Sequence, residues 1–215
     1  RVMLARKARL VKHNSRLNQG SLLDIGTGTG YFPHFMQERG WHVSAIEKSP
    51  QARQFAKEHF ELDVAAPEAL NEFADKSFDV ITLWHVMEHL EHLNETWETL
   101  KRILKDQGIL IIAVPNPTSF DAEKYKEMWG AYDVPRHLWH FSPSVMQQFG
   151  AKHDFILCER HPMPFDAFYV SMLSEKYRKS AFPFLKGLIA GTEAWIVSLA
   201  KKDRSSSMIY VFRKK

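Results

Sequence analysis

The sequence has a single cysteine, Cys158, among its 215 residues, so it can form no internal disulfide bond. Disulfides belong to proteins of oxidising compartments, and their exclusion predicts a reducing, cytoplasmic location. The sequence also lacks a signal peptide and any apolar run of the roughly 18 residues that a membrane-spanning helix needs. Because it begins with Arg1 rather than Met, we expect its natural start to lie further upstream.

A strong charge of one sign is also missing, since 29 basic and 25 acidic residues leave a net charge of only +4. The two ends, residues 1–16 and 201–215, hold twelve of the basic residues and one acidic residue, so the rest of the chain carries −7. An acidic body does not provide the basic face that nucleic acid requires, and we expect no nucleic-acid partner. The basic ends are either solvated or suited to an anionic membrane surface.

Glycine is scarce, yet three of the ten glycines fall within one stretch, Leu22–Phe32, which reads LLDIGTGTGYF. A short apolar run ends there, Gly26, Gly28 and Gly30 follow, and an amphipathic pattern begins at Tyr31. This order predicts a buried strand, a tight turn and the start of a helix, which together present backbone N–H groups to a ligand.

The ligand predicted for this turn carries no phosphate. Tyr31 stands where the dinucleotide pattern G-x-G-x-x-G needs its third glycine. Asp24, two residues before the turn, would repel a pyrophosphate and attract an ammonium group. S-adenosylmethionine (SAM) has an amino acid end, a sulfonium cation and a ribose, and it fits this pattern.

Leu22–Phe32 resembles the first motif of class I SAM-dependent methyltransferases. Three further strings, FDVITLWHVMEHL (78–90), ILKDQGILIIAVPN (103–116) and PRHLWHFSP (135–143), are similar to the branch with the ubiquinone-biosynthesis O-methyltransferases, a methyltransferase domain family 23-like group. The resemblance covers roughly Ser21–Arg160. It implies SAM as cofactor and an α/β fold, with a Rossmann-like, doubly wound sheet of seven strands, mostly parallel with an antiparallel last strand.

The rest of the chain alternates apolar runs with amphipathic segments, which favours a parallel sheet in a single domain over 1–215. The predicted strands are 22–25, 41–46, 62–64, 78–83, 108–114, 155–159 and 208–212. The predicted helices are an N-terminal helix within 1–17, then 31–39, 49–59, 93–104 and 143–150. Ser49 and Pro50 form a typical start for the third of these helices.

Two long connections are predicted to form insertions on the substrate side. Residues 115–141 are rich in aromatic side chains, which argues against disorder. Residues 162–205 contain Phe168–Tyr177 and Phe184–Leu199, both apolar at helical spacing, and we expect a helical cap inserted before the last strand.

Beyond the glycine turn with Thr27, the predicted cofactor residues are Glu47, Lys48, Tyr31 and Trp84. Glu47 ends the second strand, 23 residues after Asp24, where a carboxylate can accept hydrogen bonds from both ribose hydroxyls. The alternative is a surface glutamate that starts the next helix. The aromatic faces of Tyr31 and Trp84 would suit a sulfonium cation.

The histidine-rich segment Trp84–His92, WHVMEHLEH, allows three hypotheses. The H-x-x-E-H of zinc peptidases requires a long helix, whereas His85 directly follows a strand. Glu88, His89 and His92 resemble the metal-binding cluster of RNA 3′-end 2′-O-methyltransferases, although a second upstream glutamate is missing. We favour the third hypothesis, in which these side chains line the methionine end of the cofactor pocket and no metal is bound.

If the acceptor is a hydroxyl, a general base helps its methylation, and histidine has a suitable pKa. The candidates are His137 first, His85 second, and then His140. His137 belongs to the PRHL string, which the resemblance places over the acceptor side. Each of these histidines could instead be satisfied by a backbone partner.

The aromatic connection and the apolar cap predict a small, aromatic or lipid-like acceptor, methylated at oxygen. Residues 183–199 are mostly apolar, with only Lys186 and Glu193 charged, which suits a peripheral contact with the inner membrane surface. A buried cap helix or a dimer contact would have the same pattern. The alternatives to a small-molecule methyltransferase are a SAM-binding regulatory module without turnover and a metal-assisted RNA 2′-O-methyltransferase.

Overall fold

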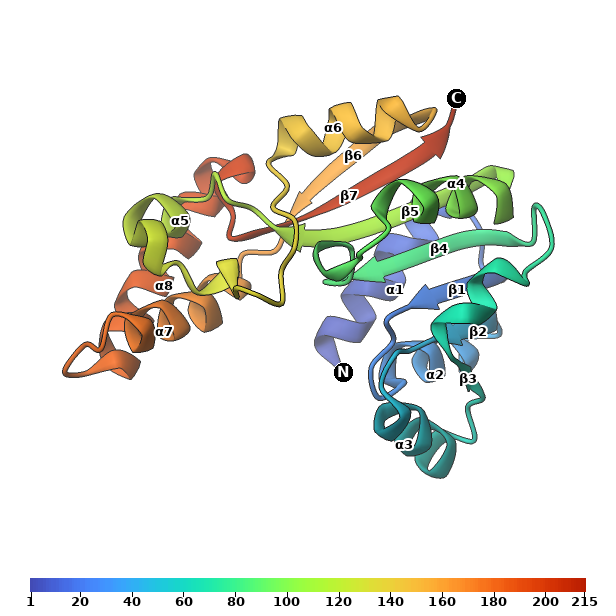
Figure 1. Ribbon diagram of the computed structural model, residues 1–215, viewed down its shortest axis with the longest axis horizontal. Helices are drawn as coiled ribbons and strands as arrows, with labels where there is room; N and C mark the ends of the chain where they lie inside the picture. The colour runs from blue at the N-terminus through green and yellow to red at the C-terminus, as the bar shows by residue number, and fades with distance from the viewer.

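A seven-stranded sheet forms the centre of the computed structural model, which describes residues 1–215. The strand order is β3-β2-β1-β4-β5-β7-β6, and β7 alone runs antiparallel to its neighbours β5 and β6 (Figure 1). The strands are β1 Ser21–Ile25, β2 His42–Ile46, β3 Val64–Ala65, β4 Phe78–Trp84, β5 Leu104–Pro115, β6 Phe155–Pro162 and β7 Ser207–Lys214. The predicted fold class, with its antiparallel last strand, is confirmed.

Helices cover both faces of this sheet. The helices are α1 Val2–Ser15, α2 Tyr31–Gln37, α3 Pro50–Phe60, α4 Leu93–Ile103, α5 Phe120–Tyr125, α6 Pro143–Lys152, α7 Asp166–Tyr177 and α8 Pro183–Ala200. The 3-10 turns are η1 Pro67–Asn71, η2 Met87–His89, η3 Lys126–Met128, η4 Gly130–Tyr132 and η5 Lys202–Arg204. One core, with Val11 and Met36, packs α1 and α2 on the sheet. The other, with Trp97 and Met146, packs α4 and α6 on the opposite face.

The strands differ from their expected bounds by one to four residues at an end, and for two of them the reason is local. Leu62 is buried, but its N–H donates to Ala56 O and closes the end of α3, so β3 begins only at Val64. β5 begins before the expected Gly108, because Leu104 already pairs with Phe78 and the register shifts before Ile109. Ser49 caps α3 as expected, since its side chain accepts a hydrogen bond from Ala52 N.

The long connections form a helical cap of α5, α7 and α8, which Figure 1 shows at one end of the sheet. Glycines let α8 approach α7 closely. A Cβ atom at Gly187 would lie 2.5 Å from Met172 Cα, and one at Gly191 would lie 2.8 Å from Phe168 Cα. Buried hydrogen bonds tie α7 to the first connection, with Gly130 N donating to Ser174 Oγ over 2.7 Å.

Candidate active site

The glycine turn lies at the carboxyl end of β1, where a doubly wound sheet binds its ligands. Gly26, Gly28 and Gly30 all have positive φ angles of 69°, 59° and 84°. A Cβ atom at Gly26 would lie 2.3 Å from Val86 Cγ2, whereas one at Gly28 would meet no atom within 4 Å. The turn is therefore packed at Gly26 and open at Gly28, which is the geometry of a backbone that a ligand approaches.

Glu47 is attached to the turn itself. Its Oε2 accepts from Gly28 N and its Oε1 accepts from Ser49 N, both over 2.8 Å. Each oxygen keeps a free lone pair, so the carboxylate is oriented and can still accept from a diol. Lys48, next to it, is exposed and lies 3.8 Å from Glu91 Oε1.

Asp24 is 1% exposed and lies beneath the turn, where its Oδ1 accepts a hydrogen bond from Thr82 Oγ1. Burial raises the pKa of Asp24 to about 6, although Thr82 and the nearby Lys7 ammonium act in the opposite direction. Lys7 comes from α1 and was not among the expected site residues. Its only signal in the sequence is a basic position on an amphipathic N-terminal helix.

The Lys7 ammonium lies 4.3 Å from the centre of the Trp84 ring, a cation–π arrangement at the end of β4. Burial lowers the pKa of Lys7, and Asp24 and Asp166 oppose this effect. Trp84 is 9% exposed and its Nε1 has no hydrogen-bond partner. Thr27 Oγ1 is likewise buried and unpartnered. Thr27 belongs to the glycine turn, and Trp84 ends β4.

Tyr31 lies apart from Trp84. Its ring is 54% exposed and packs edge-on against Phe60, with centroids 5.0 Å apart, next to Phe55 of α3. Trp84 instead contacts Phe32 and Lys7. Of the two expected aromatic faces, only Trp84 therefore lies beside the charged groups under the turn.

A cavity of about 140 Å³ lies between α1 and the start of the cap. Trp84, Lys7 and Asp166 are among its lining residues, with apolar walls from Met3, Met163, Phe165 and Ile209. The N-terminal helix therefore closes one side of a mixed polar and apolar pocket.

His85 is held between two carboxylates. Its Nε2 lies 3.3 Å from Asp166 Oδ2 and its Nδ1 lies 3.4 Å from Glu88 Oε1. Burial alone would lower the pKa of His85, but Asp166 and Glu88 together raise it to about 9. The ring is therefore an imidazolium at neutral pH. In that form both ring nitrogens carry a proton.

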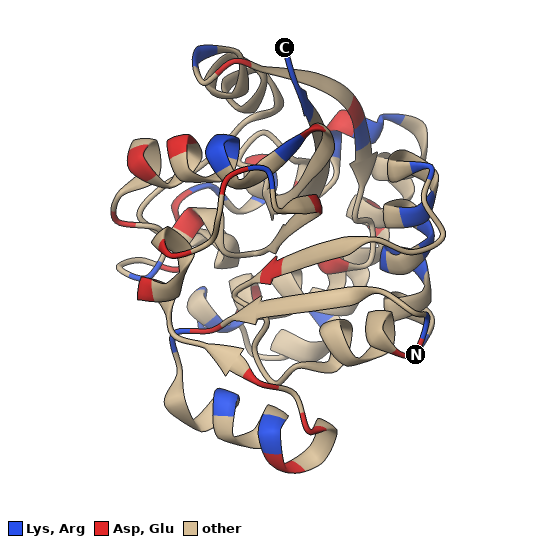
Figure 2. Cartoon of the chain, turned by 90° about the vertical axis from the view of Figure 1, so that its right-hand side faces the viewer, with Lys and Arg blue, Asp and Glu red and all other residues tan.

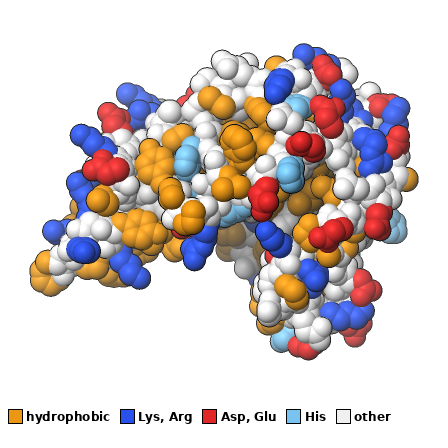
Figure 3. Space-filling model, viewed as in Figure 1, with side chains coloured by type: hydrophobic (Ala, Val, Ile, Leu, Met, Phe, Trp, Pro, Cys, Tyr) orange, Lys and Arg blue, Asp and Glu red, His pale blue; other side chains and the backbone are white.

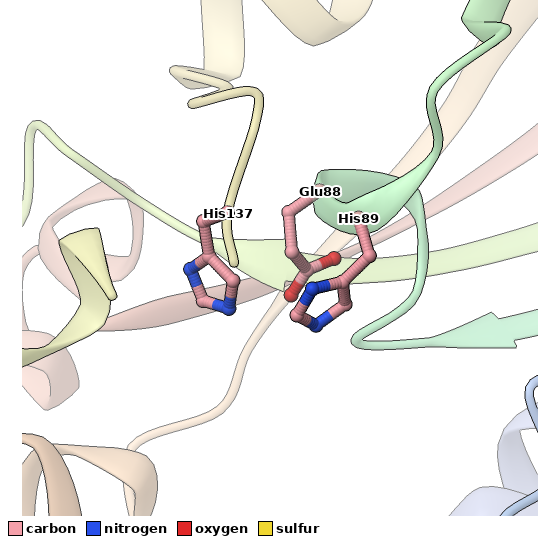
Figure 4. Close-up of side chains that lie close together, drawn as sticks. All are labelled: Glu88, His89 and His137. Atoms are coloured by element: carbon pink, nitrogen blue, oxygen red, sulfur yellow. The ribbon is translucent and has the colours of Figure 1, made fainter. Parts of the chain in front are cut away.

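Glu88, His89 and His137 converge at the carboxyl ends of the central strands, with one donor atom of each within 4.8 Å of the others (Figure 4). Glu88 and His89 belong to η2, directly after β4, and His137 belongs to the connection between β5 and α6. His92 is exposed, and its neighbour Leu93 begins α4. The structure thus groups Glu88 and His89 with His137, and not with His92 as in the second of the three hypotheses.

Backbone hydrogen bonds hold this grouping together. Leu138 N and Trp139 N both donate to the Glu88 carbonyl oxygen, over 2.8 and 3.3 Å, and Trp139 Nε1 donates to Leu90 O. The PRHLWHF segment is in this way attached to η2. His140 is exposed, and burial and the neighbouring His137 lower its pKa.

This sheet, with its open glycine turn and flanking carboxylates, is that of an adenosyl-binding α/β domain. A family model described as "Methyltransferase domain" matches residues 1–158, and the chain belongs to that family. SAM is the cofactor of this family.

Two curated relatives show how far the sequence similarity extends. An uncharacterized methyltransferase of Staphylococcus carnosus is 33% identical over 111 residues, covering 51% of this chain and 52% of the relative. The mitochondrial ubiquinone biosynthesis O-methyltransferase of Schizosaccharomyces pombe is 30% identical over 105 residues, covering 45% and 38%. The chain spans about half the length, or less, of these two relatives.

The crystal structure of a SAM dependent methyltransferase from Archaeoglobus fulgidus matches 99% of this chain and 93% of its own, with a TM-score of 0.64. The two are 17% identical, so this likeness establishes the fold alone.

Proposed function

We propose that the chain is a SAM-dependent methyltransferase whose acceptor is a small aromatic or lipid-like molecule, methylated at oxygen. The observation that carries the proposal is the glycine turn, open at Gly28 and flanked by the carboxylates of Asp24 and Glu47. The charges of Asp24 and Asp166 both raise the pKa of Lys7 against the effect of burial, and Asp166 Oδ2 lies 3.3 Å from His85 Nε2.

The residues present fit SAM. Glu47 would accept from the ribose hydroxyls, and the open backbone at Gly28 leaves room for the ribose and the amino acid chain. Asp24 and Lys7 offer a negative and a positive charge to a zwitterionic amino acid end. The buried Trp84 ring would help to keep water away from the bound cofactor. When bound, SAM supplies a methyl group already activated on a sulfonium.

His137 is the residue suited to take the acceptor's proton. Its Nδ1 lies 2.8 Å from Ala131 O, and because a carbonyl only accepts, the proton is on Nδ1 and the Nε2 lone pair is free. Its side chain is 11% exposed, which shields the lone pair from bulk water. A hydroxyl placed beside Nε2 would lose its proton to the imidazole as its oxygen attacks the methyl group.

Calorimetry with SAM and its demethylated product, followed by detection of S-adenosylhomocysteine release with hydroxylated aromatic acceptors and a cell extract, tests this function. We expect His137→Ala to lower kcat by about 100-fold or more while SAM affinity changes little. His92→Ala, an exposed histidine outside the cluster, is the matched control. SAM binding without release from any acceptor would instead support a regulatory module.

The cap has a surface suited to an anionic membrane, and we propose it as the contact through which a lipid-like acceptor is reached. Apolar side chains are exposed along α8 and just before it. They are Phe182, Phe184, Leu185, Leu188, Ile189, Ile196 and Leu199. Four basic residues are close to them in the sequence, at Lys176, Arg178, Lys179 and Lys186. Figure 3 shows hydrophobic and basic side chains together at the cap end of the molecule.

Membrane contact here would be peripheral, since no helix has the length and apolar composition to cross a bilayer. The basic positions of α1, which Figure 2 shows along the helix that begins at the N-terminus, would add to the attraction. Flotation with vesicles containing anionic lipid should carry the chain upward, and zwitterionic vesicles should not. Phe182→Ser with Phe184→Ser should abolish flotation, whereas Val145→Ser, an exposed apolar residue of α6, should not. Equal flotation of both variants would contradict the proposed surface.

A further inference from the structure

The cluster of Glu88, His89 and His137 has the composition and the orientation of a metal site. Its three donor atoms lie within 4.8 Å of one another. Donors that share one first-row metal ion lie about 3 to 4 Å apart, so small side-chain rotations would bring all three to one ion. Figure 4 shows the two imidazoles and the carboxylate turned toward a common point.

Both imidazoles are oriented by backbone carbonyls. His89 Nδ1 lies 3.0 Å from Arg136 O, and His137 Nδ1 lies 2.8 Å from Ala131 O. Each Nδ1 therefore carries the proton, and each Nε2 keeps its lone pair for a ligand. Metal-binding histidines are usually fixed in this way, with the other ring nitrogen donating to a carbonyl or carboxylate.

Glu88 supplies an independent observation. Its side chain is 1% exposed, and neither carboxylate oxygen has a hydrogen-bond partner. The His85 ring is 3.4 Å from Oε1 but is not aligned for a hydrogen bond, and Oε2 has no partner of any kind. The His85 ring therefore lies against one oxygen of this buried carboxylate, and Oε2 is left without a partner. A bound cation is one of the few ways to satisfy that oxygen.

We infer that Glu88, His89 and His137 bind one divalent transition metal ion, which holds the acceptor's oxygen beside the methyl group. Two imidazoles and one carboxylate suit ions such as Zn²⁺, Co²⁺ or Mn²⁺ rather than Mg²⁺, which prefers oxygen ligands. Three protein ligands leave coordination positions open for an oxygen of the acceptor. The second half of this inference rests on the proposed methyltransferase function.

The metal changes the role of His137. Its Nε2 lone pair would bind the ion instead of accepting a proton, and the ion would polarise the acceptor's hydroxyl and lower its pKa. The proton would then leave to solvent when the hydroxyl binds. The two roles of His137 are thus exclusive and can be told apart by experiment.

The test begins with binding, without any activity measurement. The untagged, chelator-treated chain is titrated with Co²⁺, and visible absorption bands report coordination by protein ligands. We expect one Co²⁺ per chain, displaced by Zn²⁺ but not by excess Mg²⁺. His137→Ala and the isosteric Glu88→Gln should weaken binding at least about tenfold. His92→Ala should bind as the parent chain does, and circular dichroism checks that each variant is folded.

A methyl-transfer assay then tests whether the metal ion holds the acceptor. Chelator-treated protein should lose methyl transfer and regain it with Zn²⁺ or Mn²⁺. Co²⁺ bands that are absent, or equal in the parent chain and both cluster variants, overturn the metal site. Full turnover of the chelated protein overturns the role in holding the acceptor and leaves His137 as a base, with the proposed methyltransferase function intact. Absence of turnover under every condition, with normal Co²⁺ binding, would instead contradict that function.

Discussion

Asp24 should destabilise the ligand-free protein at neutral pH, and Asp24→Asn should therefore stabilise it. The carboxyl is 1% exposed, and burial raises its pKa from 3.8 to about 6. One pKa unit corresponds to about 1.4 kcal/mol, so keeping the group ionised in the folded state costs about 3 kcal/mol at pH 7. Asparagine has no charge to bury and can still accept from Thr82. The pKa of about 6 already includes the attraction of Lys7, so this figure is the net cost of the charge.

The raised pKa of Asp24 also determines whether stability rises or falls with pH. A folded-state pKa above the unfolded one means that the folded protein holds the proton more tightly, so stability falls as pH rises from about 4 through 6. Urea unfolding of both proteins between pH 4 and 7.5, without cofactor, should show the advantage of Asp24→Asn widening by about 1 kcal/mol between pH 5 and 7. The difference in unfolding free energy between the two proteins at each pH isolates the contribution of Asp24 from those of the other titrating groups.

Bound SAM should make the parent chain more stable than Asp24→Asn, the reverse of the order without cofactor. SAM binds only the folded state and should stabilise the parent chain by mass action, whereas the variant, which cannot meet an ammonium group with a charge, should gain little. Calorimetry should show SAM affinity of the parent chain falling below pH 6, as Asp24 takes up its proton. An advantage of Asp24→Asn that is absent or independent of pH would refute the reasoning about burial. Unchanged SAM affinity in the variant would refute the role of Asp24 in binding.

Three further predictions concern the turn, the cap and the imidazolium. Gly28→Ala should lower SAM affinity at least tenfold, because its Cβ would enter the open space that we expect the cofactor to occupy, and the positive φ should cost only about 1 kcal/mol of stability. Calorimetry measures the affinity and urea unfolding the stability, and an unchanged affinity would place the cofactor elsewhere. Gly187→Ala should destabilise the folded protein by about 1–3 kcal/mol, although alanine favours helices, because its Cβ would lie 2.5 Å from Met172. A gain in thermal stability would contradict that contact, and Lys186→Ala, at an exposed position, serves as control. Stability should fall as pH rises through about 9, where His85 loses its proton, and Asp166→Asn should remove much of this fall in unfolding curves.

Much of the sheet was predictable because its signals are local. Apolar runs such as Ile109–Val114 indicate strands buried on both faces, and the positive φ angles of the turn need glycine whatever lies around them. Gly187 and Gly191 show where a local signal is ambiguous. Their sequence positions interrupt an apolar helix, and only the neighbouring α7 explains why a side chain is excluded there.

The sequence by itself determined the order of strands and helices, the glycine turn and its flanking acids Asp24 and Glu47. Those features depend on residue periodicity and backbone preference within a few neighbouring residues. The tertiary structure alone decided that Lys7 lies over Trp84, that His85 is an imidazolium between Glu88 and Asp166, and that His137 joins Glu88 and His89. These groupings join segments that are far apart in the sequence, and their charge and proton positions follow from burial and partners that exist only after packing.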